Sequence, residues 1–581
     1  MIKICSSSGI KLILTHCFLI FLLSPALSQQ SREISSPYQY SIQKKITGKK
    51  GAVVSAHPLA SKAGLDILIK GGNAVDAAIA TQLALAVVYP GAGNIGGGGF
   101  LVATLENGKT LAIDYREKAP AAAHRDMYLD SAGNALTKLS QSGHLASGVP
   151  GTIAGLFASH KYAKLSFTEL IQPAIELAEK GFSITASEAS SLNSNRSYFL
   201  QNNTKPNSFV RDKAWKAGDT LVQKELANTL KRVRDFGMKG FYEGETARLI
   251  VEEMNRGKGL ITYYDLKNYT AKEREAIRFA YKEYTIITMP LPSSGGLIIQ
   301  QALKILESRE LSKMGFQTPA SVQLVAEVER RAYADRAAFM GDEDFVKVPV
   351  KTLVSADYLN ERMKSFVPGK AGKSADIKEG NIPHESEETT HLSIADQWGN
   401  AVSVTTTLNG GYGSGTVVGG AGFLLNNEMD DFSVKPGVPN MYGAVGAEAN
   451  AIAPGKRMLS SMTPTILLRK EKPFLVLGTP GGTTIPTSVL QTILNILEFN
   501  LSTEDAVNKP KFHHQWLPDM IMVENGFPQA VTDSLKAMGY QVNKRGQIGR
   551  TEVIKITRPK KNKLVFEAVG DNRGDDDAEA Y

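Results

Sequence analysis

The stretch Thr389-Thr390-His391-Leu392-Ser393-Ile394-Ala395 decides the fold, because a strand pattern begins there with a hydroxyl side chain. Polar and apolar residues alternate along it, which predicts a β-strand. The preceding segment, 374–388, is polar and predicts a loop. If the bond before Thr389 is cut, the freed α-amine becomes a base beside its own hydroxyl, and the threonine becomes a nucleophile.

Strand patterns and glycine turns follow this stretch. A short loop, 396–400, separates two strand patterns, so residues 390–395 and 401–407 are predicted to form a hairpin. A second pair of strands is predicted at 466–468 and 474–477, and a helix is predicted at 485–500.

The part of the chain before Thr389 predicts the same mixture of elements. Residues 51–56 predict a strand, Asn73 is placed to cap an alanine-rich helix, and further strands end at Leu105 and Ile113. Apolar spacing predicts helices at 166–181, 223–236, 244–256 and 320–340. Strands and helices in both parts predict a layered α/β architecture and not separate modules.

The first residues have the pattern of a secretory signal peptide. Lys3 and Lys11 precede the apolar run 12–23, and Ala26-Leu27-Ser28 is a small-x-small site, so cleavage is predicted after Ser28. The alternative is an uncleaved membrane anchor, but the apolar run is short for a bilayer span. Both cysteines, Cys5 and Cys17, lie inside this segment, so the mature chain is predicted to lack disulfides and thiol-based sites.

Charge and glycine patterns disfavour several classes of function. The formal net charge of +8 is spread over 581 residues without an aromatic-interleaved basic stripe, which disfavours nucleic acid as a partner. The glycines of 93–99 lack the lysine and hydroxyl of a nucleotide loop, so they are interpreted as points of close backbone packing. His513 and His514 are interpreted as structural, and the acidic run 575–577 as solvated surface.

Several residues around Thr389 suit acyl transfer. A freed α-amine has a pKa of roughly 7.7–8.0 and can accept the hydroxyl proton near neutral pH. Gly481 and Gly482 follow a predicted strand and can offer backbone N–H groups to an oxyanion. Asp431 suits a substrate ammonium, and Ser460 and Ser461 suit a substrate carboxylate. Each feature alone is also compatible with an ordinary strand, turn or surface pair.

Together these segments carry a resemblance to a known family. The chain resembles the γ-glutamyltranspeptidases, also called glutathione hydrolases, of the N-terminal-nucleophile hydrolase superfamily, over nearly all of its mature length. The matching motifs lie at 72–78, 93–100, 114–117, 292–296, 389–391, 425–431, 459–462 and 480–482. The resemblance implies a four-layer αββα sandwich built jointly by two subunits.

The resemblance also implies a role for each matching residue. Thr389 would be the nucleophile for self-cleavage and turnover, and Thr407 would orient it by a hydrogen bond. Arg116 would bind the α-carboxylate of a γ-glutamyl group as a bidentate partner, supported by Ser460 and Ser461.

Further residues would complete the pocket. Asn409, Glu428 and Asp431 would bind the α-ammonium, although Glu428 stands where some bacterial relatives carry glutamine. Gly481 and Gly482 would donate to the oxyanion. Tyr442 would belong to a lid loop at about 436–447, with Asn409 as its partner.

The implied enzyme is an exported proenzyme, periplasmic or secreted, without stable membrane insertion. It would divide into a signal peptide, 1–28, a large subunit, 29–388, and a small subunit, 389–581, which form a heterodimer. It would use no metal or organic cofactor. It would pass the γ-glutamyl group of glutathione or related compounds to water, amino acids or peptides. The alternatives are a related acylase of the cephalosporin acylase kind and, from another class, a non-catalytic exported binding protein.

Overall fold

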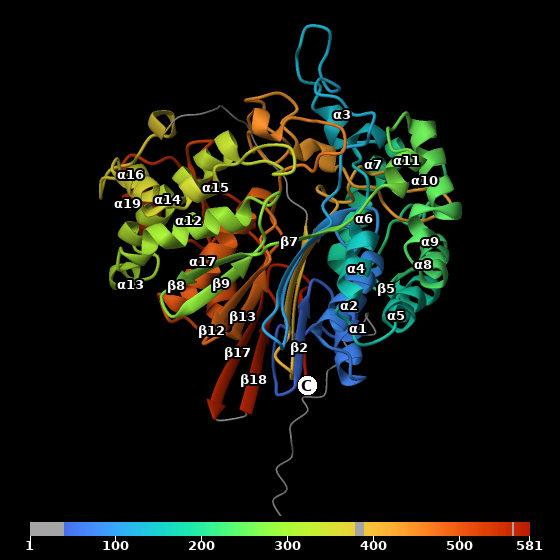
Figure 1. Cartoon of the computed structure of the whole chain (residues 1–581), viewed down its shortest axis with the longest axis horizontal. Helices are drawn as coiled ribbons and strands as arrows, with labels where there is room; N and C mark the ends of the chain where they lie inside the picture. Colours follow the sequence, from blue (N-terminus) through green and yellow to red (C-terminus); the bar gives the residue numbers. More distant parts are fainter. Residues whose placement is uncertain (1–39, 378–388, 561–562) are drawn as a thin grey trace, which may run out of the picture.

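The computed structural model describes residues 40–377, 389–560 and 563–581. The signal-peptide prediction and the residue before the expected cut, Glu388, lie outside these ranges. Two seven-stranded antiparallel sheets face each other, and helices cover the outer side of each sheet (Figure 1). The predicted αββα architecture is therefore confirmed.

The first sheet contains the strand that starts after Thr389. Its order is β19 (Asp577–Ala580), β2 (Gly51–Ser55), β10 (Thr390–Asp396), β11 (Ala401–Thr407), β3 (Gly98–Thr104), β4 (Thr110–Asp114) and β7 (Lys272–Arg274). Strands β10 and β11 form the predicted hairpin, with Thr390 opposite Thr406. Strands from before Thr389 lie on both sides of the β10–β11 hairpin, so this sheet cannot form from either part alone.

The second sheet combines the two parts of the chain in the same way. Its order is β1 (Lys45–Gly48), β18 (Lys563–Val569), β17 (Glu552–Lys560), β13 (Lys472–Gly478), β12 (Thr465–Arg469), β9 (Tyr284–Thr288) and β8 (Ile277–Tyr281). The predicted pair at 466–468 and 474–477 corresponds to β12 and β13.

The helices that cover the two sheets agree with the apolar spacing. On the first sheet lie α1 (Pro58–Ile69), α2 (Ala74–Val88), α4 (Thr152–His160), α5 (Phe167–Lys180), α8 (Lys224–Phe236) and α10 (Gly244–Gly257). On the second lie α12 (Gly295–Glu307), α14 (Pro319–Phe339) and α17 (Ile485–Leu497). Among the described residues, no helix is both long and apolar enough to cross a membrane.

Smaller elements complete the chain. They are β5 (Phe182–Ser183) with β6 (Thr220–Leu221), β14 (Phe512–His513) with β15 (Ile521–Val523) and β16 (Val542–Lys544), and the helices α3 (Lys138–Gln141), α6 (Ala186–Ser194), α7 (Arg196–Asn202), α9 (Lys239–Tyr242), α11 (Tyr263–Lys267), α13 (Leu311–Met314), α15 (Val350–Leu353), α16 (Ala356–Met363), α18 (Thr503–Asn508) and α19 (Gln529–Ala537).

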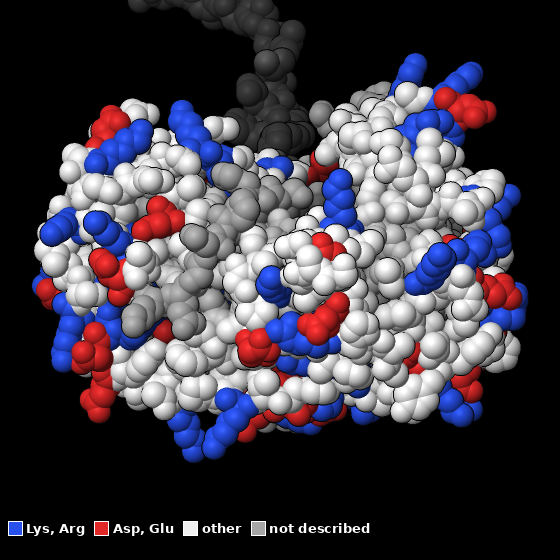
Figure 2. Space-filling view, turned by 90° about the horizontal axis from the view of Figure 1, so that it is seen from above, with Lys and Arg blue, Asp and Glu red and all other residues white. Residues whose placement is uncertain are grey.

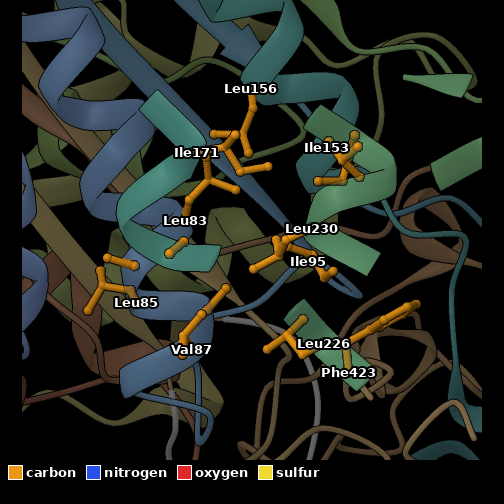
Figure 3. Close-up of a cluster of buried hydrophobic side chains, with 14 of the residues drawn as sticks. Leu83, Leu85, Val87, Ile95, Ile153, Leu156, Ile171, Leu226, Leu230 and Phe423 are labelled. Carbon is orange, nitrogen blue, oxygen red and sulfur yellow. The ribbon is translucent and has the colours of Figure 1, made fainter. Parts of the chain in front are cut away.

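Helix α2 is buried along its whole length. Asn73 caps it as predicted, because its side chain accepts hydrogen bonds from the backbone N–H groups of Val75 and Asp76. The small alanine side chains let α2 approach the first sheet closely, and Leu83, Leu85 and Val87 join a large apolar cluster there (Figure 3). This cluster fixes the position of β10 from the helix side.

Strand β10 is buried on both faces. Leu392 and Ile394 belong to the apolar cluster on the helix side. His391 and Ser393 face the second sheet, where the Ser393 hydroxyl donates to the Glu552 carbonyl at 3.2 Å. The alternation that predicts the strand therefore corresponds to one apolar face and one hydrogen-bonded face, and both faces are buried.

The acidic run near the C-terminus corrects one prediction. Asp576 and Asp577 are fully buried, so the interpretation of 575–577 as solvated surface is wrong for these two residues. Asp577 begins β19 and its Oδ1 accepts from the Gln43 N–H at 2.7 Å, while Asp576 pairs with Arg550 at 3.0 Å. A run of like charges usually lies on the solvated surface, but it can be buried where the fold supplies cationic or N–H partners, as it does here.

Candidate active site

Thr389 lies directly before β10 and is only 5% exposed. Its Oγ1 is 3.4 Å from the Oγ1 of Thr407, the last residue of the neighbouring strand β11. The Thr407 hydroxyl also accepts a hydrogen bond from the Asn409 N–H at 2.7 Å. The hairpin register thus places a hydroxyl from one strand beside the predicted nucleophile on the other.

A buried guanidinium lies in the same cavity. Arg116 follows β4, and its Nη1 is 2.6 Å from Glu428 Oε2 while its Nη2 pairs with Asp431. Burial lowers the pKa of Arg116, but the carboxylates of Glu428 and Asp431 outweigh burial and hold it above its ordinary value. Arg116 is therefore a permanent cation in this pocket.

A third acid, Glu117, lies beside the same guanidinium, and sequence analysis did not assign it to the site. Its carboxylate is fully buried, 3.7 Å from Arg116 Nη1, and burial raises its pKa to about 8. Burial likewise raises the pKa of Glu428 well above its ordinary value. Three acids around one guanidinium leave room for one more positive charge, which a substrate ammonium can supply.

Two serines, Ser460 and Ser461, also line the cavity. The Ser460 hydroxyl accepts from the Met462 N–H at 3.1 Å, and its carbonyl accepts from the Ser294 N–H at 2.8 Å. Ser461 Oγ is 3.4 Å from Nη2 of Arg336, a second cation that lines the cavity and that sequence analysis missed. Both serines are thus held by backbone and cationic groups.

The glycine pair follows β13. Gly481 has φ +135° and Gly482 has φ +51°, values that L side chains rarely adopt. A Cβ on Gly482 would lie 2.7 Å from the Tyr442 ring, which leaves no room for a side chain. Gly482 lines the cavity and Gly481 does not, although the Gly481 carbonyl accepts from the Thr484 N–H at 2.9 Å.

Two residues of the predicted lid loop, Asn440 and Tyr442, line the cavity, and the loop is held by hydrogen bonds. The Tyr442 hydroxyl donates to the Asn409 carbonyl, Asn440 Nδ2 donates to Asp431 Oδ1 at 2.8 Å, and the Met441 N–H donates to Asp430 Oδ2 at 2.6 Å. The enclosed space is about 20 Å³, which holds roughly one water molecule.

The structure brings nearly all of the predicted residues into one cavity. Its lining includes Arg116, Thr389, Thr407, Asn409, Glu428, Asp431, Tyr442, Ser460, Ser461 and Gly482. Arg336 and Asn440 are additional lining residues. They carry no motif of their own, so only the fold can reveal that they belong here.

Three buried histidines, His391, His513 and His514, do not line this cavity. Burial lowers the pKa of His391 to about 3, and its ring lies within hydrogen-bond distance of the Thr405 and Ser393 hydroxyls. Burial also lowers the pKa values of His513 and His514, to about 3 and about 4. Within the described ranges, no histidine lines the cavity beside Thr389.

Charges on the exterior are mixed. On the face seen in Figure 2, Lys and Arg side chains are interspersed with Asp and Glu, and no patch of one sign covers that face. A cluster of buried charged groups lies instead inside the protein, around Arg116.

Comparisons with known proteins agree with this geometry. The sequence profile of the γ-glutamyltranspeptidase family matches residues 60–581. The glutathione hydrolase proenzyme of Escherichia coli (strain K12) is 46% identical over 528 residues, which are 90% of this chain and 91% of that protein.

Solved structures show the same likeness. A cephalosporin acylase from Bacillus halodurans superposes with a TM-score of 0.81 at 26% identity, covering 94% of this chain and 99% of that one. A γ-glutamyltranspeptidase from Helicobacter pylori superposes with a TM-score of 0.55 at 45% identity, covering 56% of this chain and 94% of that one.

Proposed function

Because the chain belongs to the γ-glutamyltranspeptidase family, we propose that it is a self-processing enzyme that transfers or hydrolyses γ-glutamyl groups. Its substrates are glutathione and related γ-glutamyl compounds, and its acceptors are water, amino acids or peptides. The observation that supports this most is the pairing of Thr389 with Thr407 in one closed cavity with Arg116, Glu428 and Asp431.

The proposed first reaction converts one chain into two. Thr389 Oγ attacks the carbonyl of Glu388, the amide C–N bond breaks, and an ester forms. Breaking the C–N bond frees the Thr389 α-amine, and water then hydrolyses the ester, which frees the Thr389 hydroxyl and the Glu388 carboxylate. The products are a large subunit, 29–388, and a small subunit, 389–581, once the signal peptide, 1–28, is removed.

The freed amine is the base of the proposed turnover reaction. It takes the proton of the Thr389 hydroxyl, which attacks the γ-amide carbonyl of the substrate. The resulting oxyanion is stabilised by N–H groups of Gly481 and Gly482, and the same amine returns the proton to the leaving amine. Water or an amine acceptor then attacks the γ-glutamyl ester and releases Thr389.

Recognition of the γ-glutamyl head group uses the buried charges. The α-carboxylate lies between Arg116 and the hydroxyls of Ser460 and Ser461. The α-ammonium lies between Glu428, Asp431 and the Asn409 side chain. An amino-acid head group carries both charges. Its ammonium pairs with the carboxylates of the pocket, and its carboxylate pairs with Arg116.

A related acylase activity is the second candidate, supported by the likeness to the cephalosporin acylase fold. The paired charges of Arg116 and Asp431 favour an amino-acid head group over an uncharged acyl chain. A non-catalytic exported binding protein is the third, and it would remain a single chain.

The deciding experiment compares the wild-type protein with its Thr389→Ala variant by intact mass and N-terminal sequencing. We expect two chains in the wild type, one of which starts Thr-Thr-His-Leu, and one uncut chain in the variant. A Thr405→Ala variant, at a strand position outside the cavity lining, serves as the control that should still be cut. A wild-type chain that stays whole would refute the proposal and favour the binding protein.

A further inference from the structure

The catalytic cavity contains a second arginine, Arg336, to which the proposed function gives no role. Arg336 lies near the end of α14 and is only 6% exposed. It lines the same cavity as Arg116, although α14 covers the second sheet and Arg116 follows a strand of the first. The cavity therefore takes one arginine from each half of the sandwich.

The donors of Arg116 are already engaged with acceptors of the protein. Its Nη1 is 2.6 Å from Glu428 Oε2, its Nη2 pairs with Asp431, and its Nε donates to the Met458 carbonyl at 3.3 Å. A substrate carboxylate that reaches Arg116 must share it with these acceptors. Further donors in the cavity would therefore strengthen the recognition of a carboxylate.

Arg336 donates to two serine hydroxyls. Its Nη2 donates to Ser461 Oγ at 3.4 Å, and its Nε donates to Ser294 Oγ at 3.1 Å. The Ser294 hydroxyl donates its own proton to the Ser460 carbonyl at 2.7 Å, and the Ser294 N–H donates to the same carbonyl at 2.8 Å. Arg336 thus contacts both the start of α12 and the serine pair that lines the cavity.

The contact with Ser461 determines what its hydroxyl can do. A hydroxyl accepts with its oxygen and has a single proton to donate. Because Arg336 occupies the oxygen as a charged donor, it polarises the hydroxyl, whose proton becomes a better donor to a second partner. Ser461 lines the cavity, so a substrate carboxylate there can accept that proton.

We propose that Arg336 is a positioning residue for the α-carboxylate of the substrate, and that it acts by orienting the Ser461 hydroxyl toward that carboxylate. This inference rests on the proposed function, since it needs a substrate that carries an α-carboxylate. It adds to the binding by Arg116 a second cation that acts through a hydroxyl.

The helix that carries Arg336 is fixed to two other parts of the site. Tyr333, one turn earlier, donates its hydroxyl to the carbonyl of Thr483, which follows the glycine pair and lines the cavity. The Ala337 carbonyl accepts from the Ala447 N–H at 3.1 Å, at the end of the predicted lid loop. Residues three apart lie on one face of a helix, so this face holds Arg336 in a fixed place relative to the pocket.

The test is a double-mutant cycle between Arg336 and Ser461, measured as KM and kcat for γ-glutamyl-p-nitroanilide. Arg336→Met keeps most of the side-chain length and removes the donors, and Ser461→Ala removes the hydroxyl. We expect each single variant to raise KM by about tenfold, because a hydrogen bond to a charged group is lost, and to change kcat less. We expect the double variant to have the KM of Ser461→Ala, because Arg336 acts through that hydroxyl.

Two further variants serve as rescue and control. In Arg336→Lys the ammonium can still donate to Ser461 Oγ, so this variant should recover part of the lost KM. Arg278→Met makes the same chemical change at an exposed position outside the cavity lining, and it should leave the kinetics unchanged. Each protein is checked for self-cleavage by intact mass, and Arg336→Lys replaces Arg336→Met in the cycle if the latter does not fold.

A second readout separates recognition of the carboxylate from general support of the fold. γ-Aminobutyryl-p-nitroanilide differs from the γ-glutamyl substrate only in lacking the α-carboxylate. Its interaction with the enzyme is measured as hydrolysis or as competitive inhibition. We expect Arg336→Met to weaken the γ-glutamyl substrate and to leave the truncated compound unaffected.

Two results would overturn the inference while the wild type remains active. The first is an additive rise of KM in the double variant, and the second is an equal loss with the truncated compound. Either would mean that Arg336 supports the fold and does not act on the carboxylate through Ser461. A wild type that does not cleave γ-glutamyl-p-nitroanilide would instead refute the proposed function, and the inference with it.

Discussion

Arg116 is the residue around which the site is organised, and its environment is unusual for a buried cation. Glu117, Glu428 and Asp431 all approach it, so the pocket carries more acidic than basic groups. Burial keeps Glu117 and Glu428 protonated more readily than in water. The ammonium of a zwitterionic ligand would balance the excess of acidic groups. Without a ligand, protons on Glu117 and Glu428 reduce the same excess.

Replacing Arg116 by lysine should therefore damage recognition more than a conservative change suggests. Lysine keeps the charge but loses the forked pair of N–H donors that contacts two partners at once. We expect kcat/KM for γ-glutamyl-p-nitroanilide to fall by about 10- to 100-fold, mainly through KM. The control is Arg125→Lys, a surface position, which should leave the kinetics unchanged; unchanged kinetics in Arg116→Lys would contradict the pocket assignment.

Gly481 should not tolerate a side chain. Its φ is +135°, and a Cβ would lie 2.5 Å from Thr484 Oγ1, so alanine must shift the loop that offers the oxyanion donors. Loss of such a donor costs about 100- to 1,000-fold in kcat. We expect a fall of that order for Gly481→Ala, measured with the same chromogenic substrate.

Gly546→Ala provides the comparison, because a Cβ there meets no atom within 4 Å. That variant should keep wild-type kcat. A Gly481→Ala enzyme with equally normal kcat would show that the donors lie elsewhere.

At the scale of elements, the loop that carries Tyr442 lies at the cavity and is held there by a few hydrogen bonds. Removing the Tyr442 hydroxyl by Tyr442→Phe deletes its bond to the Asn409 carbonyl and keeps the ring against Gly482. One neutral hydrogen bond is worth about 1 kcal/mol, so we expect KM to change by about 2- to 10-fold. Self-cleavage, followed on a denaturing gel, should be unaffected, since the loop is not needed to place Thr389 beside Thr407.

Asp430 fastens the same loop and gives it a pH dependence. It accepts from the Met441 N–H and from the Ser140 hydroxyl, and burial raises its pKa to about 7. Because the folded state holds this proton more tightly than the unfolded chain, its contribution to stability is present at low pH and declines as pH rises through about 7. The decline is at most about 1.4 kcal/mol per pH unit.

The Asp430→Asn variant should therefore lack this decline. We expect its Tm relative to wild type to rise between about pH 5 and about pH 8, since the wild type alone loses stability through this group. Thermal unfolding at the two pH values measures the difference. Parallel Tm profiles for the two proteins would show that Asp430 does not titrate in this range.

Local patterns in the sequence predict much of this architecture. Alternation and turn residues predict β10 and β11 to within a residue, and Asn73 marks the start of α2. The burial of Asp577 in β19 has no local signal, because its partner, Gln43, lies 534 positions away in sequence.

The site shows the same division. The motif around Thr389 identifies the nucleophile as a hypothesis from the residues alone, but Arg116 and Asp431 are 315 positions apart and meet only in the fold. Their place in one pocket follows from the family resemblance and not from spacing. Arg336 lies in no matching motif, and the role of Glu117, although it ends the motif 114–117, becomes visible only when the fold sets it beside Arg116.

At the scale of the whole molecule, the C-terminal strand closes the sheet that holds the nucleophile. Strand β19 pairs with β2, which pairs with β10, and the Tyr581 carbonyl accepts from the Lys49 and Lys50 N–H groups at 2.7 Å. We expect deletion of residues 577–581 to lower Tm and to slow self-cleavage, because β2 loses its outer partner and β10 loses support. A Lys563→Ala variant, on the second sheet, is the control; self-cleavage at the wild-type rate in the deletion would contradict the argument.

The mixed origin of the strands in the first sheet has a consequence for the control of the proposed self-cleavage. The hairpin that brings Thr389 to Thr407 is local, but it is held between β2 and β3, two strands that come from before Thr389. The proposed self-cleavage would therefore occur only in molecules whose first sheet has formed correctly, and a misfolded molecule would remain an uncut precursor. After the proposed cut, both sheets would still contain strands from both pieces, so the loss of one covalent bond would not separate them.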